Sequence, residues 1–407
     1  MERHIAYDEY AAGVASCAWR EFRKTKIFGS LDGLRTLSIL AVIWHHAGTA
    51  NNSWRLLDRG FLGVDLFFVI SGFLIVTLLL REQSDNGEIS LKKFYMRRTL
   101  RIFPLYYAVI LFLALIYLTV NRNSLFGHRF LSELPYYLTY TANFFPVVGL
   151  RIVWSLATEE QFYLLWPSIE KYLAKYVVPV LLFLIALNQF VSFRRNAISD
   201  LVGSADWTQW NISQTTFTPI LLGVSAAHLL HSQRTYRLVA HFAANRWASS
   251  LCFLILVGLA TVAPVDVSGL PRLMLQLCMT AFLVSCVYRE DHALQSLLRF
   301  SPFQRIGKVS YGMYLLHIPL LTLAAYLLHS NAASISLYVV EVAITIIAAE
   351  LSFKFLESPI LRLKRKYSVA HTSDDGQKLA GGVAALVAKW RKPKTRNQPP
   401  MVVPEQV

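Results

Sequence analysis

The feature that most restricts the fold of this 407-residue chain is a series of long apolar runs that recurs along most of its length. A helix needs roughly 20 consecutive apolar residues to cross the hydrocarbon core of a bilayer, where every backbone polar group must be satisfied internally. Charged residues make up only 16% of the chain, whereas a soluble domain carries about 25%. The sequence therefore predicts an all-α, polytopic membrane protein.

The runs predict about ten membrane-spanning helices, at residues 33–50, 60–80, 102–120, 153–170, 176–193, 214–230, 247–264, 271–288, 309–328 and 336–356. The aromatic stretch 135–150 is short and flanked by Pro and Gly, so we interpret it as a re-entrant or interfacial segment on the outer side. Lys and Arg concentrate in the loops that then face inward, including a strongly basic loop at 92–101, and this bias places both termini in the cytoplasm. Arg194 and Arg195 run against the trend.

The predicted organisation has three parts: a polar leader at residues 1–30, a membrane domain at 31–360 and a basic cytoplasmic tail at 361–407. Residues 380–392 of the tail fit either a short amphipathic helix on the membrane or disorder. The net charge of +15 is explained by membrane topology better than by nucleic-acid binding. The four cysteines show no CxxC spacing, so we predict neither disulfides nor a metal site. The start of the chain carries charges of both signs and shows no signal-peptide pattern.

Polar side chains inside the apolar runs are the candidate functional residues, because charge at bilayer depth is costly unless it is paired or hydrated. Arg35 and His46 belong to the run LDGLRTLSILAVIWHH. Their spacing puts both on one face of a helix, about 16 Å apart along its axis, while His45 turns away. Further polar residues in or at the ends of such runs are Asp65, Glu159, Glu160, His317, Glu350 and Glu357.

The position of each residue along its predicted span gives its depth in the membrane. Three residues fall in the outer half, within reach of one shared cavity: His46, Asp65 and Glu159. Three basic residues fall at the inner face: Arg35, Arg98 and Arg101. Arginines suit a phosphorylated ligand from the cytoplasm, and a histidine backed by a carboxylate suits general-base activation of a hydroxyl. The pattern predicts group transfer from a nucleotide-like donor inside to an acceptor bound nearer the outside.

Each of these residues also has an ordinary explanation. A lone intramembrane histidine often serves as a hydrogen-bonding residue between helices. The basic residues around Arg98 fit topology anchors, and Glu160 points about 100° away from Glu159. A tyrosine group fits an interfacial aromatic belt better than a sugar platform: Tyr136, Tyr137 and Tyr140. Only the combination favours a functional site.

The same stretches resemble the acyltransferase 3 family of integral membrane acyltransferases over about residues 30–360. The family's motifs occur in its order: Arg35-x10-His46, Gly63-Val64-Asp65 through Ser71-Gly72-Phe73, Arg98-x-x-Arg101-Ile102-x-Pro104, Trp154-Ser155-Leu156 with Glu159 and Phe162-Tyr163-Leu164, Ser310-Tyr311 with Tyr314-Leu315, His317 and Pro319, and Glu357-Ser358-Pro359.

The resemblance implies a ten-helix enzyme that moves an acyl group, usually acetyl, from acyl-coenzyme A to a hydroxyl, commonly of a sugar. Arg35 and His46 match the family's essential pair, and Arg98 and Arg101 match its coenzyme A contacts. We assign Ser71 and Tyr311 to the donor site as well, and Trp154, Tyr163 and His317 to the acceptor. Some members carry an extracytoplasmic SGNH-type domain after the helices, where this sequence has a short basic tail. We therefore expect direct transfer or a separate transfer partner, in a cell membrane such as a bacterial inner membrane.

In the expected mechanism His46 removes the hydroxyl proton, Glu159 or Asp65 orients it, and Ser71 or Arg35 stabilises the oxyanion. A covalent acyl-enzyme on Ser71, Ser155 or His46 stays open. The alternative function is a proton-coupled exporter or flippase of a glycolipid or another anionic substrate, although the sequence shows no matching pair of broken helices. The acceptor, the acyl length and the oligomeric state, a homodimer included, are left open.

Overall fold

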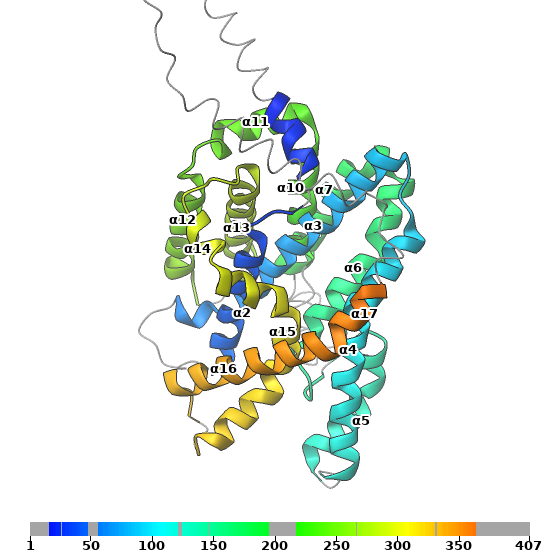
Figure 1. The fold of residues 1–407 in the computed structure, drawn as a ribbon, viewed down its shortest axis with the longest axis vertical. Helices are drawn as coiled ribbons and strands as arrows, with labels where there is room; N and C mark the ends of the chain where they lie inside the picture. The colour runs from blue at the N-terminus through cyan, green and yellow to red at the C-terminus, as the bar shows by residue number, and fades with distance from the viewer. Residues whose placement is uncertain are drawn as a thin grey trace, which may run out of the picture. The chain divides into compact units, whose positions relative to one another are not determined.

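Helices make up nearly all of the described part of the computed structural model (Figure 1). The structure describes residues 16–25, 27–47, 56–120, 124–145, 147–194, 217–265, 267–329 and 332–363, and over these ranges it contains no β-strand. The predictions for the first part of the leader, for residues 195–215 and for the tail lie outside the described residues.

Six described helical segments are long and apolar enough to cross a membrane. They are α3 (Leu62–Asn86), α4 (Leu91–Thr119), η2 with α7 (Ala174–Phe193, of which α7 is Val177–Phe193), α13 (Leu270–Tyr288), α15 (Ser301–Leu327), and α16 (Ile335–Ser352) continued by η3 and α17 to Leu363. A seventh span arises if α11 (Gln233–Ala243) and α12 (Ala248–Val262), which meet at a 74° bend, cross together. The prediction of an all-helical membrane protein is confirmed.

Each of the ten predicted runs coincides with a helix. Three of these helices are too short or too polar to count among the candidate spans. These are α2 (Leu31–Ala47), α6 (Val153–Tyr172) and α10 (Thr218–His231). Two of them carry predicted polar site residues: α2 carries Arg35 and His46, and α6 carries Glu159.

One predicted loop is wrong, and a further helix lies after residue 120. The basic stretch 92–101 is the first part of α4, which begins at Leu91 because the Ser90 side chain accepts a hydrogen bond from the Lys93 backbone N–H at 3.5 Å. Such an N-cap satisfies one of the free N–H groups at a helix start. The loop after residue 120 contains α5 (Leu125–Leu138), capped in the same way by Ser124. The aromatic stretch 135–150 is therefore the end of α5 followed by turns, and α5 is not among the candidate spans.

Helix α3 organises the part of the fold that holds the site, since it contacts α2, α6, α10 and α13. The closest approach is to α10, where a Cβ atom at Gly72 would lie 2.1 Å from the Ile220 carbonyl oxygen. A Cβ atom at Gly223 would likewise lie 2.2 Å from the Val69 carbonyl oxygen. Small residues allow helix backbones to pack this closely in membranes.

Candidate active site

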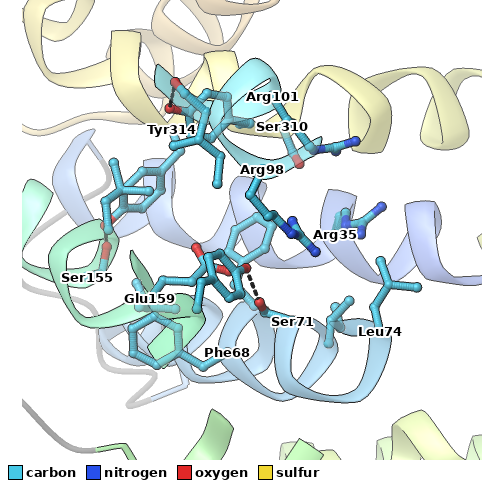
Figure 2. Close-up of a pocket in the computed structure, with 17 residues that line it drawn as sticks. Arg35, Phe68, Ser71, Leu74, Arg98, Arg101, Ser155, Glu159, Ser310 and Tyr314 are labelled. Carbon is cyan, nitrogen blue, oxygen red and sulfur yellow. Dashed lines mark hydrogen bonds between the residues drawn. The ribbon is translucent and has the colours of Figure 1, made fainter. Parts of the chain in front are cut away.

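A cavity of about 110 Å³ lies between α2, α3, α4, α6 and α15. Three arginines line it, Arg35, Arg98 and Arg101, and Figure 2 shows their side chains gathered on one side. We call it the cationic cavity. Guanidinium groups offer planar forks of donors that match phosphate and carboxylate oxygens, so this cavity favours an anionic ligand.

The surroundings hold two of these arginines in place. The Arg98 guanidinium lies over the Tyr163 ring at 4.6 Å from its centroid. Arg35 Nη1 donates to Asp32 Oδ1 at 2.8 Å, one turn earlier on α2. Arg97 instead donates to Glu82 at 2.7 Å and does not line the cavity. The basic start of α4 therefore divides into a structural arginine and two that face the cavity.

A hydrogen-bonded chain lies beside Arg98 in the wall of the cationic cavity. The Tyr163 hydroxyl donates to Glu159 and also bonds to Ser71 (Figure 2). A phenol has one proton, and that of Tyr163 lies in the hydrogen bond to Glu159. The Tyr163 oxygen is therefore the acceptor toward Ser71, whose hydroxyl donates. This chain fixes the only carboxylate among the described lining residues.

A second cavity, of about 700 Å³, holds His46 and is called the large cavity below. The His46 Nδ1 atom lies 2.9 Å from the Val42 carbonyl oxygen. A carbonyl only accepts, so Nδ1 carries the proton of the neutral ring and Nε2 keeps its lone pair. A fixed tautomer of this kind suits a general base. Trp154 also lines this cavity.

The two cavities meet at Val64 and Tyr314, which line both. The Tyr314 hydroxyl is 2.6 Å from Ser155 Oγ and donates to the Ile152 carbonyl oxygen at 3.0 Å. Val64 and Tyr314 therefore form the part of the wall that the two cavities share.

The structure distributes the predicted site residues over the two cavities. Seven line the cationic cavity: Arg35, Ser71, Arg98, Arg101, Glu159, Tyr163 and Tyr311. Two line the large cavity: His46 and Trp154. Two line neither: Asp65 and His317. His46, Asp65 and Glu159 are thus not brought together in one cavity, and the group that orients His46 in this structure is the Val42 carbonyl.

Asp65 and His317 are buried in the walls. Asp65 Oδ1 and Oδ2 each accept a hydrogen bond from Arg272 at 2.9 Å, and Oδ2 accepts another from Gln276 at 3.0 Å. His317 is fully buried, with its Nδ1 atom 2.6 Å from the Tyr314 carbonyl oxygen. Its ring lies behind His46, with 5.1 Å between the ring centroids.

Sequence reasoning missed the residues that complete the large cavity, notably Arg151, Arg272 and Gln276. Arg272 carried a usable signal, because it is an arginine in an apolar run that the rule for intramembrane charge should have singled out. Its partner Asp65 is far away in sequence, so the pair itself was not visible. Within the described ranges, no group of three or more His, Cys, Asp or Glu side chains could hold a metal ion.

The fold and the site define a class: an all-helical membrane protein in which an arginine-lined cavity adjoins a cavity that contains a histidine. The family model described as an acyltransferase domain matches residues 28–351, so the chain belongs to the acyltransferase 3 family. No solved structure matches it significantly.

Three curated bacterial proteins are similar over most of this chain. The peptidoglycan O-acetyltransferase OatA of Listeria monocytogenes is 30% identical over 354 residues, which cover 82% of this chain and 56% of that protein. A putative O-acetyltransferase of Staphylococcus aureus is 28% identical, covering 83% of this chain and 58% of its own length. The putative peptidoglycan O-acetyltransferase YrhL of Bacillus subtilis is 28% identical, with coverage of 81% and 54%. The chain thus spans little more than half the length of these relatives.

Proposed function

We propose that the protein is a membrane O-acyltransferase that moves an acetyl or other short acyl group from acyl-coenzyme A to a hydroxyl of a cell-surface or lipid-linked carbohydrate. The observation that carries the proposal is the junction at Val64 and Tyr314, where an arginine-lined cavity meets one that contains a histidine base. Family membership and the names of the O-acetyltransferase relatives support the acyl chemistry and a glycan acceptor.

The proposal includes the membrane arrangement. We infer ten membrane-spanning helices with both termini in the cytoplasm of a bacterial cell, so that the cationic cavity opens toward the cytoplasmic acyl donor. The coincidence of all ten predicted runs with helices supports this count. Reporter fusions in the described loops, such as residues 87–90 and 289–294, test it, since both belong on the cytoplasmic side.

The cationic cavity has the chemistry for the donor. Arg98, Arg101 and Arg35 offer guanidinium groups for the phosphates of coenzyme A. The volume of about 110 Å³ is well below that of a site for a whole cofactor, so it suits the thin pantetheine arm with the nucleotide at the mouth. The arm would then bring the thioester to the junction at Tyr314.

His46 carries the proton transfer. Its Nε2 lone pair accepts the proton of the acceptor hydroxyl while that oxygen attacks the thioester carbonyl. The new C–O bond forms, the C–S bond breaks, and the coenzyme A thiolate takes the proton from His46. Arg35 lines the same cavity and offers guanidinium N–H donors for the oxyanion, whereas the Ser71 proton is already donated to Tyr163.

The test compares His46→Ala with the control His241→Ala, which removes an exposed histidine of α11. General-base catalysis contributes about 10²- to 10⁴-fold, so His46→Ala should lose acceptor-dependent thiol release by at least about a hundredfold. Coenzyme A binding should persist, because His46 does not line the cationic cavity. Full activity in His46→Ala would refute its role. A purified wild-type protein that releases no thiol from acetyl-coenzyme A would favour the exporter alternative.

A further inference from the structure

Helix α11 is turned sharply away from the direction of its neighbour α12. The two helices meet at a bend of 74° after a short break. The α12 segment contains no charged residue and exposes three large apolar side chains, Leu251, Leu254 and Ile255, as a helix that crosses lipid does. Membrane-spanning helices tilt by about 20° on average. A helix that is bent by 74° from such a span therefore runs close to the plane of the bilayer.

The leader lies against α11 and fixes the side of the membrane on which α11 is found. The Gln233 Nε2 and Arg237 Nη2 atoms both donate to the Ser16 hydroxyl, each at 2.8 Å. The Trp19 indole N–H donates to the His231 carbonyl oxygen at 3.1 Å. Figure 1 accordingly shows α11 beside the helical part of the leader. In the proposed topology this side is the cytoplasmic one.

The two faces of α11 differ in burial. Tyr236 and Ala243 are buried, whereas Leu238 is 65% exposed and Phe242 is 40% exposed. Because an α-helix turns by about 100° per residue, Leu238 and Phe242 share one face, and the buried pair lies roughly 140–160° around the axis. Two large apolar side chains therefore point away from the protein, which is typical of a surface that meets a partner or a membrane.

Arginines border this apolar pair. Arg234 lies one turn before Leu238 and Arg237 lies directly before it, and both arginines are exposed. The sequence from residue 231 to 247 contains no Asp or Glu. Trp247 is 61% exposed and follows the end of α11, and tryptophan is enriched where a membrane meets water. A basic helix with an exposed apolar pair has the composition of an interfacial helix.

An anionic phospholipid complements this surface in both of its parts. The acyl chains accept the apolar pair, and the phosphate accepts hydrogen bonds from guanidinium groups, whose long stems reach from the apolar region to the head groups. The described linings of the cationic cavity and the large cavity include no residue of α11. The surface is therefore separate from the candidate active site.

We propose that α11 is an interfacial helix that binds anionic phospholipid in the cytoplasmic leaflet, with its exposed apolar pair among the acyl chains and Arg234 and Arg237 on the phosphates. The inference goes beyond acyl transfer and shares with the proposed function only the cytoplasmic position of α11. An acidic soluble partner is the competing occupant of the same surface.

The first experiment measures lipid affinity. The full-length protein in a neutral detergent is titrated with phosphatidylglycerol and, separately, with phosphatidylcholine, and native mass spectrometry gives the fraction with bound lipid. Each arginine near an anionic membrane surface contributes about fivefold to binding. The double variant Arg234→Gln with Arg237→Gln should therefore weaken the affinity for phosphatidylglycerol about 25-fold and change that for phosphatidylcholine much less.

A matched double variant controls for the loss of charge. Lys92→Gln with Lys93→Gln removes two exposed charges from the start of α4, which lies on the same side of the membrane in the proposed topology. This variant should keep the wild-type preference for phosphatidylglycerol. Equal losses of affinity in the two double variants would mean that net charge alone governs lipid binding.

The second experiment measures the depth of α11 in nanodiscs of equal parts phosphatidylglycerol and phosphatidylcholine. Leu238→Cys and Lys24→Cys are each made in a Cys17→Ser background, because Cys17 is the exposed cysteine in the described part of the chain. Lys24 is an exposed residue of the leader. A membrane-impermeant maleimide should label the Leu238→Cys variant about tenfold or more slowly than the Lys24→Cys variant, because a thiol among acyl chains meets little water and ionises less readily.

The outcomes separate the inference from the proposed function. A wild type without preference for phosphatidylglycerol, equal losses in the α11 and lysine variants, or equal labelling rates would each overturn the inference. Equal labelling rates would also mean that the apolar pair meets water, as a surface for an acidic soluble partner does. None of these results bears on thioester cleavage. A wild type that never cleaves acetyl-coenzyme A would overturn the proposed function and leave lipid binding to its own two assays.

Discussion

Removing both charges of the Asp65–Arg272 pair should harm the fold much less than removing either one. The pair joins α3 to α13 through two hydrogen bonds of 2.9 Å, with Asp65 completely buried and Arg272 nearly so. Breaking a buried pair by removing one partner costs about 3–5 kcal/mol, because the other charge stays buried without compensation. Asp65→Leu also frees the Gln276 amide, at a further cost of about 1 kcal/mol.

The double variant Asp65→Leu with Arg272→Met leaves no buried charge without a partner. Replacing a buried ion pair by apolar residues of similar volume is often neutral or stabilising. Its free energy of unfolding should lie within about 2 kcal/mol of the wild type, when measured by tryptophan fluorescence in mixed micelles. The exposed pair Arg289–Asp291 provides the control, and Arg289→Met should cost less than about 1 kcal/mol. A double variant as unstable as the sum of its singles would refute this reasoning.

Two further predictions concern packing and the donor. Gly72→Ala should lower the free energy of unfolding by about 1–3 kcal/mol, because its Cβ would meet the Ile220 carbonyl oxygen at 2.1 Å. Gly258→Ala, on α12 with no atom within 4 Å of the new Cβ, should instead be neutral or stabilising by up to about 1 kcal/mol. A loss at Gly258 equal to that at Gly72 would contradict the packing explanation. Arg98→Gln should raise the KM for acetyl-coenzyme A about tenfold and leave the KM for the acceptor unchanged. Steady-state kinetics in which each substrate is varied separately measure both constants. A raised KM for the acceptor with an unchanged KM for acetyl-coenzyme A would contradict this role of Arg98.

The helices could be predicted from sequence where a single physical requirement, apolar length, decides them. Each predicted run finds its helix, and α6 begins at Val153 as expected. The errors arise where charge was taken as evidence of a loop. The basic segment after Ser90 is helical because a side-chain cap starts α4 early, and Lys and Arg are themselves good helix formers.

The candidate site was predictable only in part, for a similar reason. Arg35 and His46 could be singled out because their cost is local: a polar group in an apolar run needs a partner. Which partner it finds is a matter of tertiary packing. The depth of each residue along its span predicted that Glu159 and His46 share a cavity. In the structure they line different cavities, because depth alone does not say toward which neighbouring helix a side chain points. The pairing of Asp65 with Arg272 likewise depends on how α3 and α13 meet.

The separation of the two cavities predicts the kinetic order of the reaction. Under the proposed assignment the donor binds in the cationic cavity and the acceptor in the large cavity, and the described linings of the two share Val64 and Tyr314. Both substrates then fit at once, and neither has to leave before the other enters. Initial rates measured against both substrates should then give intersecting double-reciprocal lines, as for a ternary complex. Coenzyme A should compete with acetyl-coenzyme A and not with the acceptor. A covalent acyl-enzyme on Ser71 would instead give the parallel lines of a ping-pong reaction. Ser71 lines the donor side and holds the Tyr163–Glu159 chain, so parallel lines would transfer the chemistry from His46 to that chain.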